Sequence, residues 1–299
     1  MEKLNYMKCF LCSAENHTKF NQVESFGFPL VYYQCDHCGL IFQSSDESRA
    51  GDPEFYAETY RKIYQGNANP TAKDLWVQNK RAAHLLDLIK PFQSEIPSRV
   101  LDIGASSGTL LQAFKQSYHC EAVGVEPGDA YREYAEAQGL RMVESLDELV
   151  SKNEPLFELI SLIHVLEHLP DPVGTLCRIR ETLLTRDGLL LIEVPNFYTH
   201  DSYELAHLIC FTPYTLVEML KKAGFNVKAK HRHGVPRSSL LNLYITIIAQ
   251  PLSKTYSEVP IKPDHFVRLK RRIGFLYRRI VQKFFPDRAW LAMPEEGID

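Results

Sequence analysis

The sequence contains no apolar run near the roughly 20 residues that a membrane-spanning helix needs. It has no excess of positive charge either, because 34 Lys and Arg against 37 Asp and Glu give a formal net charge of −3. Such a balance supplies no broad basic field for nucleic acid. The polar start Met1–Asn5 lacks the features of a secretory leader. We therefore expect a cytoplasmic protein that does not have nucleic acid as a partner.

The sequence has seven cysteines, and an odd number argues against a framework in which all cysteines form disulfides. Four of the seven cysteines form two C-x-x-C pairs separated by 22 residues: Cys9 with Cys12, and Cys35 with Cys38. Each pair aims two thiolates at one ion, and two pairs complete a tetrahedral zinc site. Four protein ligands leave no position for a substrate, so the predicted zinc is structural. The alternatives are four metal-free thiols, or His17 or His37 as a ligand, although both histidines break the paired spacing.

A helical arm is expected to follow this zinc ribbon, which we place at residues 1–48. The arm spans residues 49–95 and contains three tyrosines on one helical face: Tyr56, Tyr60 and Tyr64. They either pack the arm onto the next domain or form a lid over a binding site. Residues 74–90 are predicted to be an amphipathic helix that Pro91 ends.

The strand–turn–helix pattern of Val100–Gly108 (VLDIGASSG) indicates a nucleoside site. Gly104 and Gly108 let backbone amides approach a ligand beside a helix N-terminus. The turn has one glycine fewer than a pyrophosphate-binding G-x-G-x-x-G loop, and its carboxylate, Asp102, suits a cation. Glu126 ends the next expected strand, 22 residues after Gly104, where an acid accepts hydrogen bonds from a ribose diol. A ligand with a ribose, an ammonium group and no phosphate is S-adenosylmethionine.

These segments resemble class I S-adenosylmethionine-dependent methyltransferases. The closer resemblance is to bacterial members with an N-terminal zinc ribbon, a group that includes nucleotide-sugar C-methyltransferases. The resembling segments lie roughly within residues 99–225 and read VLDIGASSGTLL, VGVEP, FELISLIHVLEHLPDP, GLLLIEVPN and HLICFTPYTLVEMLKKAGF. The resemblance implies a Rossmann-like seven-stranded sheet whose last strand is antiparallel. We assign the cofactor contacts to Asp102, Gly104, Ala105, Gly108, Glu126, Pro127, Ser145, Leu146 and His164, although Ser145 is also a typical helix N-cap.

Strand-like and helical segments alternate through the middle of the chain, which independently predicts an α/β fold with a mostly parallel sheet. The expected strands are 99–103, 121–126, 141–143, 156–163, 188–194, 226–231 and 240–249. The expected helices are 107–116, 130–138, 146–152, 173–184 and 213–223. Ligands of such folds bind at the carboxyl ends of the strands. We place the catalytic domain at residues 96–250.

The segment His164-Val-Leu-Glu167-His168 follows the fourth expected strand. It has the form of an H-x-x-E-H metalloprotease motif, but Pro170 and Pro172 forbid the continued helix that such a motif needs. At the end of a strand these residues instead lie near the methyl donor. His164 then contacts the methionine part of the cofactor, and His168 is either a substrate contact or a structural loop residue.

A polar and aromatic stretch at residues 197–209 follows the fifth expected strand, where a substrate loop belongs. His207 fits a general base that removes a proton from the acceptor, with His168 as the second choice. Sugar-modifying relatives often carry a Glu-His pair where this chain has Ala206-His207. Because the expected orienting carboxylate is missing, this departure argues against a carbon acceptor and leaves oxygen and nitrogen acceptors open.

Residues 251–299 form a tail of different composition, in which residues 268–285 are basic and amphipathic. This segment either packs on the body or a partner, or it adheres to an anionic membrane surface. The second interpretation would place the protein peripherally at the inner membrane face.

The function predicted from these features is methyl transfer to a small molecule, on resemblance a sugar or a nucleotide-linked sugar. One alternative is a zinc-ribbon methyltransferase that acts on RNA or a protein. The few basic residues near the start (Lys3, Lys8 and Lys19 within the first 40) and the lack of an N-P-P-Y motif count against it. A second alternative is a cofactor-binding protein without catalysis.

Overall fold

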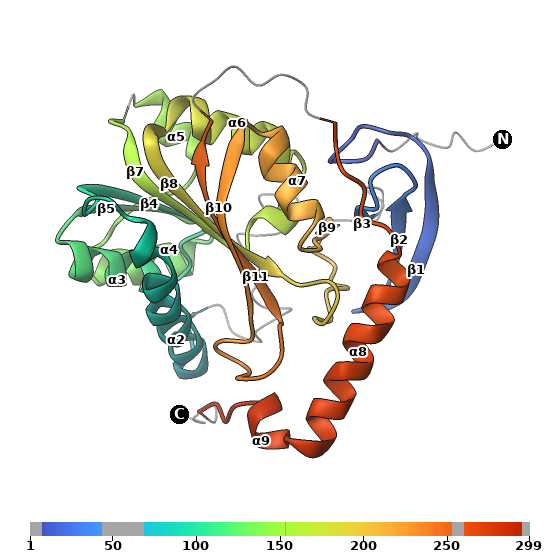
Figure 1. Ribbon diagram of the computed structural model, residues 1–299. Coiled ribbons are helices and arrows are strands. Elements are labelled where there is room, and N and C mark those ends of the chain that lie inside the picture. The colour runs from blue at the N-terminus through green and yellow to red at the C-terminus, as the bar shows by residue number, and fades with distance from the viewer. Residues whose placement is uncertain (1–7, 44–68, 153, 253–259, 295–299) are drawn as a thin grey trace.

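A seven-stranded sheet forms the centre of the computed structural model, which describes residues 8–43, 69–152, 154–252 and 260–294 (Figure 1). The strand order is β10-β11-β8-β7-β4-β5-β6. The strands are β4 (Arg99–Ile103), β5 (Glu121–Val125), β6 (Arg141–Val143), β7 (Phe157–Ile163), β8 (Leu184–Pro195), β10 (Phe225–His233) and β11 (Tyr244–Pro251). Pairing is parallel except that β11 runs antiparallel to β8 and β10. The predicted Rossmann-like sheet is confirmed, whereas Tyr56, Tyr60 and Tyr64 lie outside the described residues.

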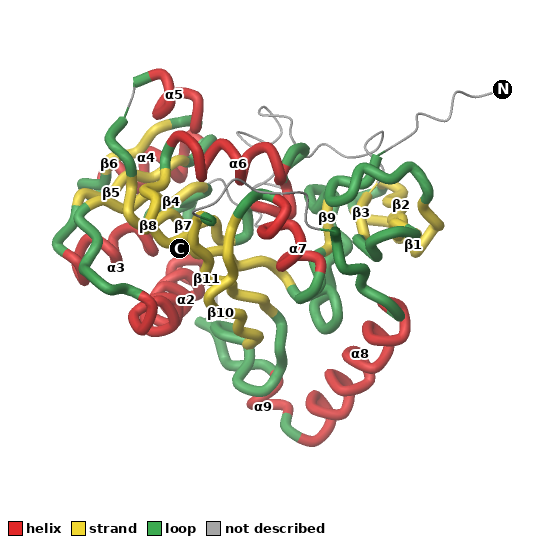
Figure 2. Tube along the Cα trace, turned by 45° about the horizontal axis from the view of Figure 1, so that its top comes forward, coloured by secondary structure: helices red, strands yellow, loops and turns green. Residues whose placement is uncertain are grey.

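Helices cover both faces of this sheet (Figure 2). One face carries α2 (Ala72–Ile89), α3 (Thr109–Tyr118) and α4 (Asp129–Ala137). The other carries α5 (Leu146–Ser151), α6 (Pro172–Thr182) and α7 (Thr215–Lys222). Successive residues of β4 point to opposite faces, so Val100 packs with the first helices and Leu101 with the second. Burial on both faces explains why the parallel strands are apolar runs.

A second, four-stranded sheet contains the N-terminal cysteine region and one strand from much later in the chain. Its strands are β1 (His17–Ser25), β2 (Phe28–Cys35), β3 (Ile41–Gln43) and β9 (Ile209–Cys210). β9 pairs antiparallel with β3, and the Gln43 amide donates to the Leu208 carbonyl over 2.8 Å. The Tyr32 hydroxyl donates to the Glu204 carbonyl over 3.0 Å. The N-terminal sheet therefore supports the stretch that contains His207.

Some element boundaries differ from the sequence prediction. β8 begins at Leu184 instead of residue 188, directly after α6. β11 begins at Tyr244 instead of residue 240. α7 begins at Thr215, although the Thr212 hydroxyl accepts the amides of Tyr214 and Thr215 and so caps the turn before it. Short connections such as η2 (Lys90–Phe92) and η3 (Leu166–His168) are 3₁₀ turns.

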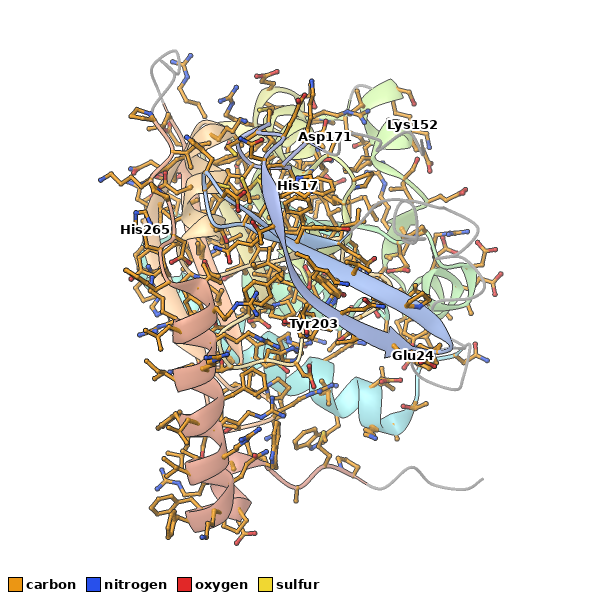
Figure 3. The ribbon with its side chains drawn as sticks, turned by 90° about the vertical axis from the view of Figure 1, so that its right-hand side faces the viewer. His17, Glu24, Lys152, Asp171, Tyr203 and His265 are labelled. Atoms are coloured by element: carbon orange, nitrogen blue, oxygen red, sulfur yellow. The ribbon has the colours of Figure 1, made fainter. Side chains whose placement is uncertain are left out.

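The tail forms α8 (Val267–Phe284) and α9 (Pro286–Ala289). α8 runs past the N-terminal sheet, and Tyr203 lies between the two (Figure 3). The Arg271 Cζ atom lies 4.1 Å from the centroid of the Phe197 ring, and the Arg271 guanidinium donates to the His200 carbonyl over 3.1 Å. Arg278 donates to the Thr199 carbonyl over 3.1 Å. Basic residues of α8 thus pack inward on the body. Within the described ranges, no helix combines the length and the apolar character that a bilayer span requires.

Candidate functional site

A cavity of about 750 Å³ opens at the carboxyl ends of the central parallel strands and extends along α2. This volume lies within the range of small-molecule sites and suits a nucleoside cofactor together with a small acceptor. Its lining includes these residues expected to bind the cofactor: Asp102, Gly104, Ala105, Glu126, Pro127, Ser145, Leu146 and His164. His168 and His207 line the same cavity. Gly108 lies outside the lining; with φ at +73°, a Cβ there would come within 2.3 Å of Leu140 Cδ1.

The turn after β4 brings bare backbone to the cavity. Gly104 has φ at +74°, and a Cβ at this position would lie 2.4 Å from Val165 Cγ2, so a larger residue does not fit. At the end of β5, the buried Glu126 carboxylate accepts the amides of Ser106 over 2.8 Å and Gly128 over 3.0 Å. Each amide occupies one lone pair of a different oxygen, so each oxygen can accept one more hydrogen bond. A ribose diol supplies two such donors.

Asp102 lies at the base of the cavity and is 3% exposed. The Ser161 hydroxyl donates to this carboxylate. Burial raises the pKa of Asp102 to about 7, the Ser161 hydrogen bond opposes the shift, and the charge of Glu126 adds to it. A carboxylate so close to protonation at neutral pH is stabilised in its ionised form by a bound cation.

α2 contributes residues to the cavity that were not among the predicted site residues. Asp74, Gln78 and Arg81 line the cavity. Gln78 also accepts the Ser107 hydroxyl over 2.6 Å and contacts Ser106 Oγ over 3.3 Å, which holds α2 against the glycine turn. These three polar residues recur at helical spacing, a pattern that could have indicated a polar face toward a ligand.

Glu193 anchors a buried charge network at the end of β8. Its carboxylate is fully buried and lies 2.8 Å from Arg81 Nε, 3.3 Å from His164 Nε2 and 3.2 Å from His233 Nε2. The Thr246 hydroxyl donates to it over 2.9 Å. Burial opposes ionisation, but the contacts with His164 and His233 and the charge of Arg81 hold the pKa of Glu193 well below its usual range. The network fixes α2 and β7 relative to each other.

His164 lies between two carboxylates. Its backbone φ is +57°, which is uncommon for a residue with a side chain. Its Nδ1 lies 3.4 Å from Glu167 Oε1, and its Nε2 faces Glu193. Burial and Arg81 disfavour a charged ring, but Glu167 and Glu193 outweigh them and raise the pKa of His164. The contacts of His164 with Glu167 and Glu193 join the ends of β7 and β8.

The rings of His168 and His207 lie beside each other in the cavity, with centroids 4.8 Å apart and planes tilted by 60°. His168 Nδ1 is 2.9 Å from the Ala206 carbonyl, and His207 Nδ1 is 3.1 Å from the Ser202 carbonyl. Burial, and then the charge of His207, lower the pKa of His168 to about 4. The carboxylate missing at position 206 has a substitute, because Glu204 Oε2 lies 3.5 Å from His207 Nε2. Glu204 and His207 are three residues apart in the sequence, a spacing that could have indicated this pair.

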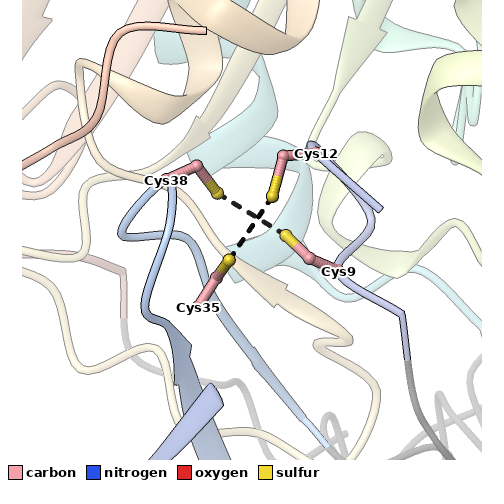
Figure 4. Close-up of side chains that lie close together, drawn as sticks. All are labelled: Cys9, Cys12, Cys35 and Cys38. Atoms are coloured by element: carbon pink, nitrogen blue, oxygen red, sulfur yellow. Dashed lines mark hydrogen bonds between the residues drawn. The ribbon is translucent and has the colours of Figure 1, made fainter. Parts of the chain in front are cut away.

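The four cysteines of the N-terminal sheet converge on one point (Figure 4). Their Sγ atoms all lie within 4.8 Å of one another, and those of Cys9 and Cys38 are 3.5 Å apart. Four Zn–S bonds of about 2.3 Å would place sulfur atoms about 3.8 Å apart, so the cluster is close to the size of a zinc site. His17 does not join the cluster and packs on Tyr33 and Phe42 instead.

Comparisons with known proteins are consistent with this site. A family model described as a methyltransferase domain matches residues 76–230. The chain is similar to 1,6-didemethyltoxoflavin-N1-methyltransferase from Burkholderia thailandensis, solved with 1,6-didemethyltoxoflavin and S-adenosylhomocysteine (TM-score 0.51, 20% identity, 72% of this chain and 96% of that one). It is also similar to the PH0226 protein of Pyrococcus horikoshii OT3 (TM-score 0.50, 15% identity, 65% and 99%). No curated protein sequence matches. At these identities the structures support the fold alone.

Proposed function

Because the chain belongs to the methyltransferase domain family, we propose that it transfers a methyl group from S-adenosylmethionine to a small acceptor, a sugar or a nucleotide-linked sugar. The observation that carries this proposal is the shared cavity. Asp102, Gly104 and Glu126 line it from the ends of β4 and β5, and His168 and His207 line it from the segments that follow β7 and β8. The remaining lone pairs of the Glu126 carboxylate fit the ribose of a nucleoside.

Different residues of the cavity would bind the cofactor and activate the acceptor. S-adenosylmethionine supplies a methyl group made electrophilic by its sulfonium. Asp102 would neutralise the ammonium end and Glu126 would hold the ribose, which leaves the part of the cavity beside His168 and His207, the acceptor end, for the acceptor. The protein's main contribution is to position the acceptor in line with that methyl. The neutral Nε2 of His207, or second of His168, takes the acceptor proton.

The acceptor end of the cavity is polar, which supports a hydroxyl-rich acceptor. His200, Glu204 and Arg237 line it beside His207. These side chains offer both donors and acceptors, as recognition of a sugar requires. Glu204 lies beside the His207 Nε2 that takes the proton, so its charge would stabilise the imidazolium that forms with a carbon, oxygen or nitrogen acceptor.

Methyl transfer can be tested with isotope-labelled S-adenosylmethionine and a cell-extract metabolite fraction. We expect label in a low-mass, sugar-containing product, and a His207→Gln variant that binds S-adenosylhomocysteine normally but transfers little label. Label in RNA or protein would instead favour the alternative macromolecular substrate. Cofactor binding without transfer to any fraction would favour a non-catalytic protein.

Cofactor binding should depend on pH through Asp102. The pKa of this carboxyl is raised to about 7, so part of the population is protonated near neutrality, and pairing with the ammonium group requires deprotonation. Binding therefore releases a proton below pH 7, and affinity for S-adenosylhomocysteine should rise about tenfold from pH 6 to pH 8. Calorimetry at the two pH values measures this ratio. In Asp102→Asn the ratio should fall to about one; an unchanged ratio in that variant would assign the titration to another group.

We further propose that α8 binds an anionic membrane surface. Its outward face exposes large apolar residues at helical spacing: Leu269, Ile273, Leu276, Ile280 and Phe284. Arg272, Arg279 and Lys283 flank them and are exposed, and α8 contains no acidic residue. Pairing with a second copy would bring like charges together, whereas each cation near an anionic bilayer contributes about 1 kcal/mol.

Vesicle sedimentation tests this contact. The protein should pellet with phosphatidylglycerol-containing vesicles and stay in solution with phosphatidylcholine alone. Replacing both Ile273 and Ile280 by Asp should abolish pelleting, while Leu156→Asp, at an exposed apolar position far from α8, should not. Equal pelleting of all variants, or a dimer that the Ile273 and Ile280 changes dissociate, would contradict membrane binding.

A further inference from the structure

Glu167 is a buried carboxylate whose hydrogen-bonding needs are not met. Its side chain is 1% exposed, and within the described part of the chain neither oxygen has a hydrogen-bond partner. His164 Nδ1 lies 3.4 Å away as an ion-pair contact. His164 also faces Glu193, so it compensates the charge of Glu167 only in part, and a buried carboxylate is costly unless a cation comes close. The environment of Glu167 therefore favours a positive ligand.

The two neighbouring imidazoles have the tautomer that a metal needs. A carbonyl oxygen only accepts hydrogen bonds, so the contacts to Ala206 and Ser202 place the protons of His168 and His207 on Nδ1. In the neutral rings the lone pair then belongs to Nε2. Metal-binding histidines commonly donate their other ring N–H to a carbonyl in this way, which fixes the ring orientation.

The three side chains are close enough to share one ion. Ligand atoms of Glu167, His168 and His207 all lie within 4.8 Å of one another. Metal bonds of about 2.1 Å place donors about 3 to 4 Å apart, so small side-chain shifts complete the site. Two histidines and one carboxylate leave coordination positions open, as in catalytic metal sites. Because His168 and His207 line the cavity, those positions face the acceptor.

We propose that Glu167, His168 and His207 bind a divalent first-row cation that activates an oxygen acceptor. The cation binds the acceptor hydroxyl, ideally with a neighbouring hydroxyl as a second ligand, and lowers its pKa. The proton passes to the Glu204 carboxylate, which lies 3.5 Å from His207 Nε2. The alkoxide lone pair forms the new O–CH₃ bond while the C–S bond of the cofactor breaks. The electron pair of that C–S bond stays on sulfur, which becomes a neutral thioether. The imidazoles then hold the cation instead of taking the proton.

The catalytic role rests on the proposed methyl transfer, but cation binding does not. The test uses Mn²⁺, because hard cations avoid thiolate sites such as the cysteine cluster. Electron paramagnetic resonance follows the loss of the free Mn²⁺ signal as the ion binds the whole protein. We expect one bound equivalent in the wild type and binding at least about 100-fold weaker in Glu167→Gln and in His168→Gln. His200→Gln, which changes a cavity histidine outside the cluster, should bind Mn²⁺ like the wild type.

Calorimetry with S-adenosylhomocysteine and a melting curve for each variant separate the outcomes. Lost Mn²⁺ binding with intact nucleoside binding supports the site. A wild type that binds no Mn²⁺, or a Glu167→Gln variant that binds it equally well, overturns the metal proposal and leaves methyl transfer with His207 as base. Absent nucleoside binding in the wild type would contradict the proposed function itself.

Discussion

Replacing Glu126 by Ala should weaken the binding of S-adenosylhomocysteine by about 100-fold or more. The carboxylate can give two charge-assisted hydrogen bonds to a ribose, each contributing about 1.5 to 3 kcal/mol. It also holds the amides of Ser106 and Gly128, so its removal loosens the turn that faces the ligand. Titration calorimetry on purified protein measures the loss directly.

The matched control for this experiment is Glu133→Ala, which removes an acid from the surface of α4. This variant should bind S-adenosylhomocysteine like the wild type. A melting curve for Glu126→Ala shows whether the fold survives the change. Wild-type affinity in a folded Glu126→Ala protein would mean that the ribose lies elsewhere and that the cofactor assignment is misplaced.

Loss of the cysteine cluster should abolish methyl transfer while leaving nucleoside binding largely intact. We propose Zn²⁺ as its ligand, because four thiolates of this spacing suit a tetrahedral structural site. In Cys35→Ser the cysteine cluster loses one metal ligand. We expect the pairing between β3 and β9 to weaken as a result. His207 and Glu204 then move, and a misplacement of about 1 Å costs about 100-fold in rate. Asp102 and Glu126 lie on the central sheet and keep their geometry.

The comparison measures kcat/KM for the acceptor found in the labelling screen and, separately, the affinity for S-adenosylhomocysteine. Cys177→Ser is the control, because Cys177 is a half-buried thiol on α6 outside the cluster. Zinc content by atomic absorption should fall in Cys35→Ser alone. Full turnover in a zinc-free Cys35→Ser protein would show that the sheet does not position the acceptor end. Equal losses of turnover and nucleoside affinity would show that it supports the whole fold.

The central sheet was predictable because each strand is a local apolar run and each helix has its own periodicity. The glycine turn and Glu126 were predictable for a similar reason, since a strand end, a positive φ and an acid at a fixed distance are features of short segments. The C-x-x-C spacing indicated the cysteine cluster before any fold was known. Its gathering of four sulfur atoms within 4.8 Å follows from two local turns brought together by β2.

The acceptor end was only partly predictable, because long-range contacts build it. β9 has two residues, too few for any periodicity, and exists because β3 offers it a pairing edge. Arg81, Glu193 and His233 are far apart in sequence, and they meet only because α2 packs across the strand ends and β11 pairs with both β8 and β10. In α8 the pattern indicated an amphipathic helix, but not that Arg271 and Arg278 would turn inward to backbone carbonyls and leave the apolar stripe exposed.

The central α/β sheet, the strand ends that line the cavity and the two cysteine pairs follow from the sequence alone, because each depends on neighbours along the chain. Tertiary structure decided that Glu204 substitutes for the missing partner of His207, that Glu167 joins His168 and His207, and that the N-terminal sheet supports them. Those features depend on which distant segments come into contact at the ends of β7 and β8. The packing of the whole chain determines these contacts.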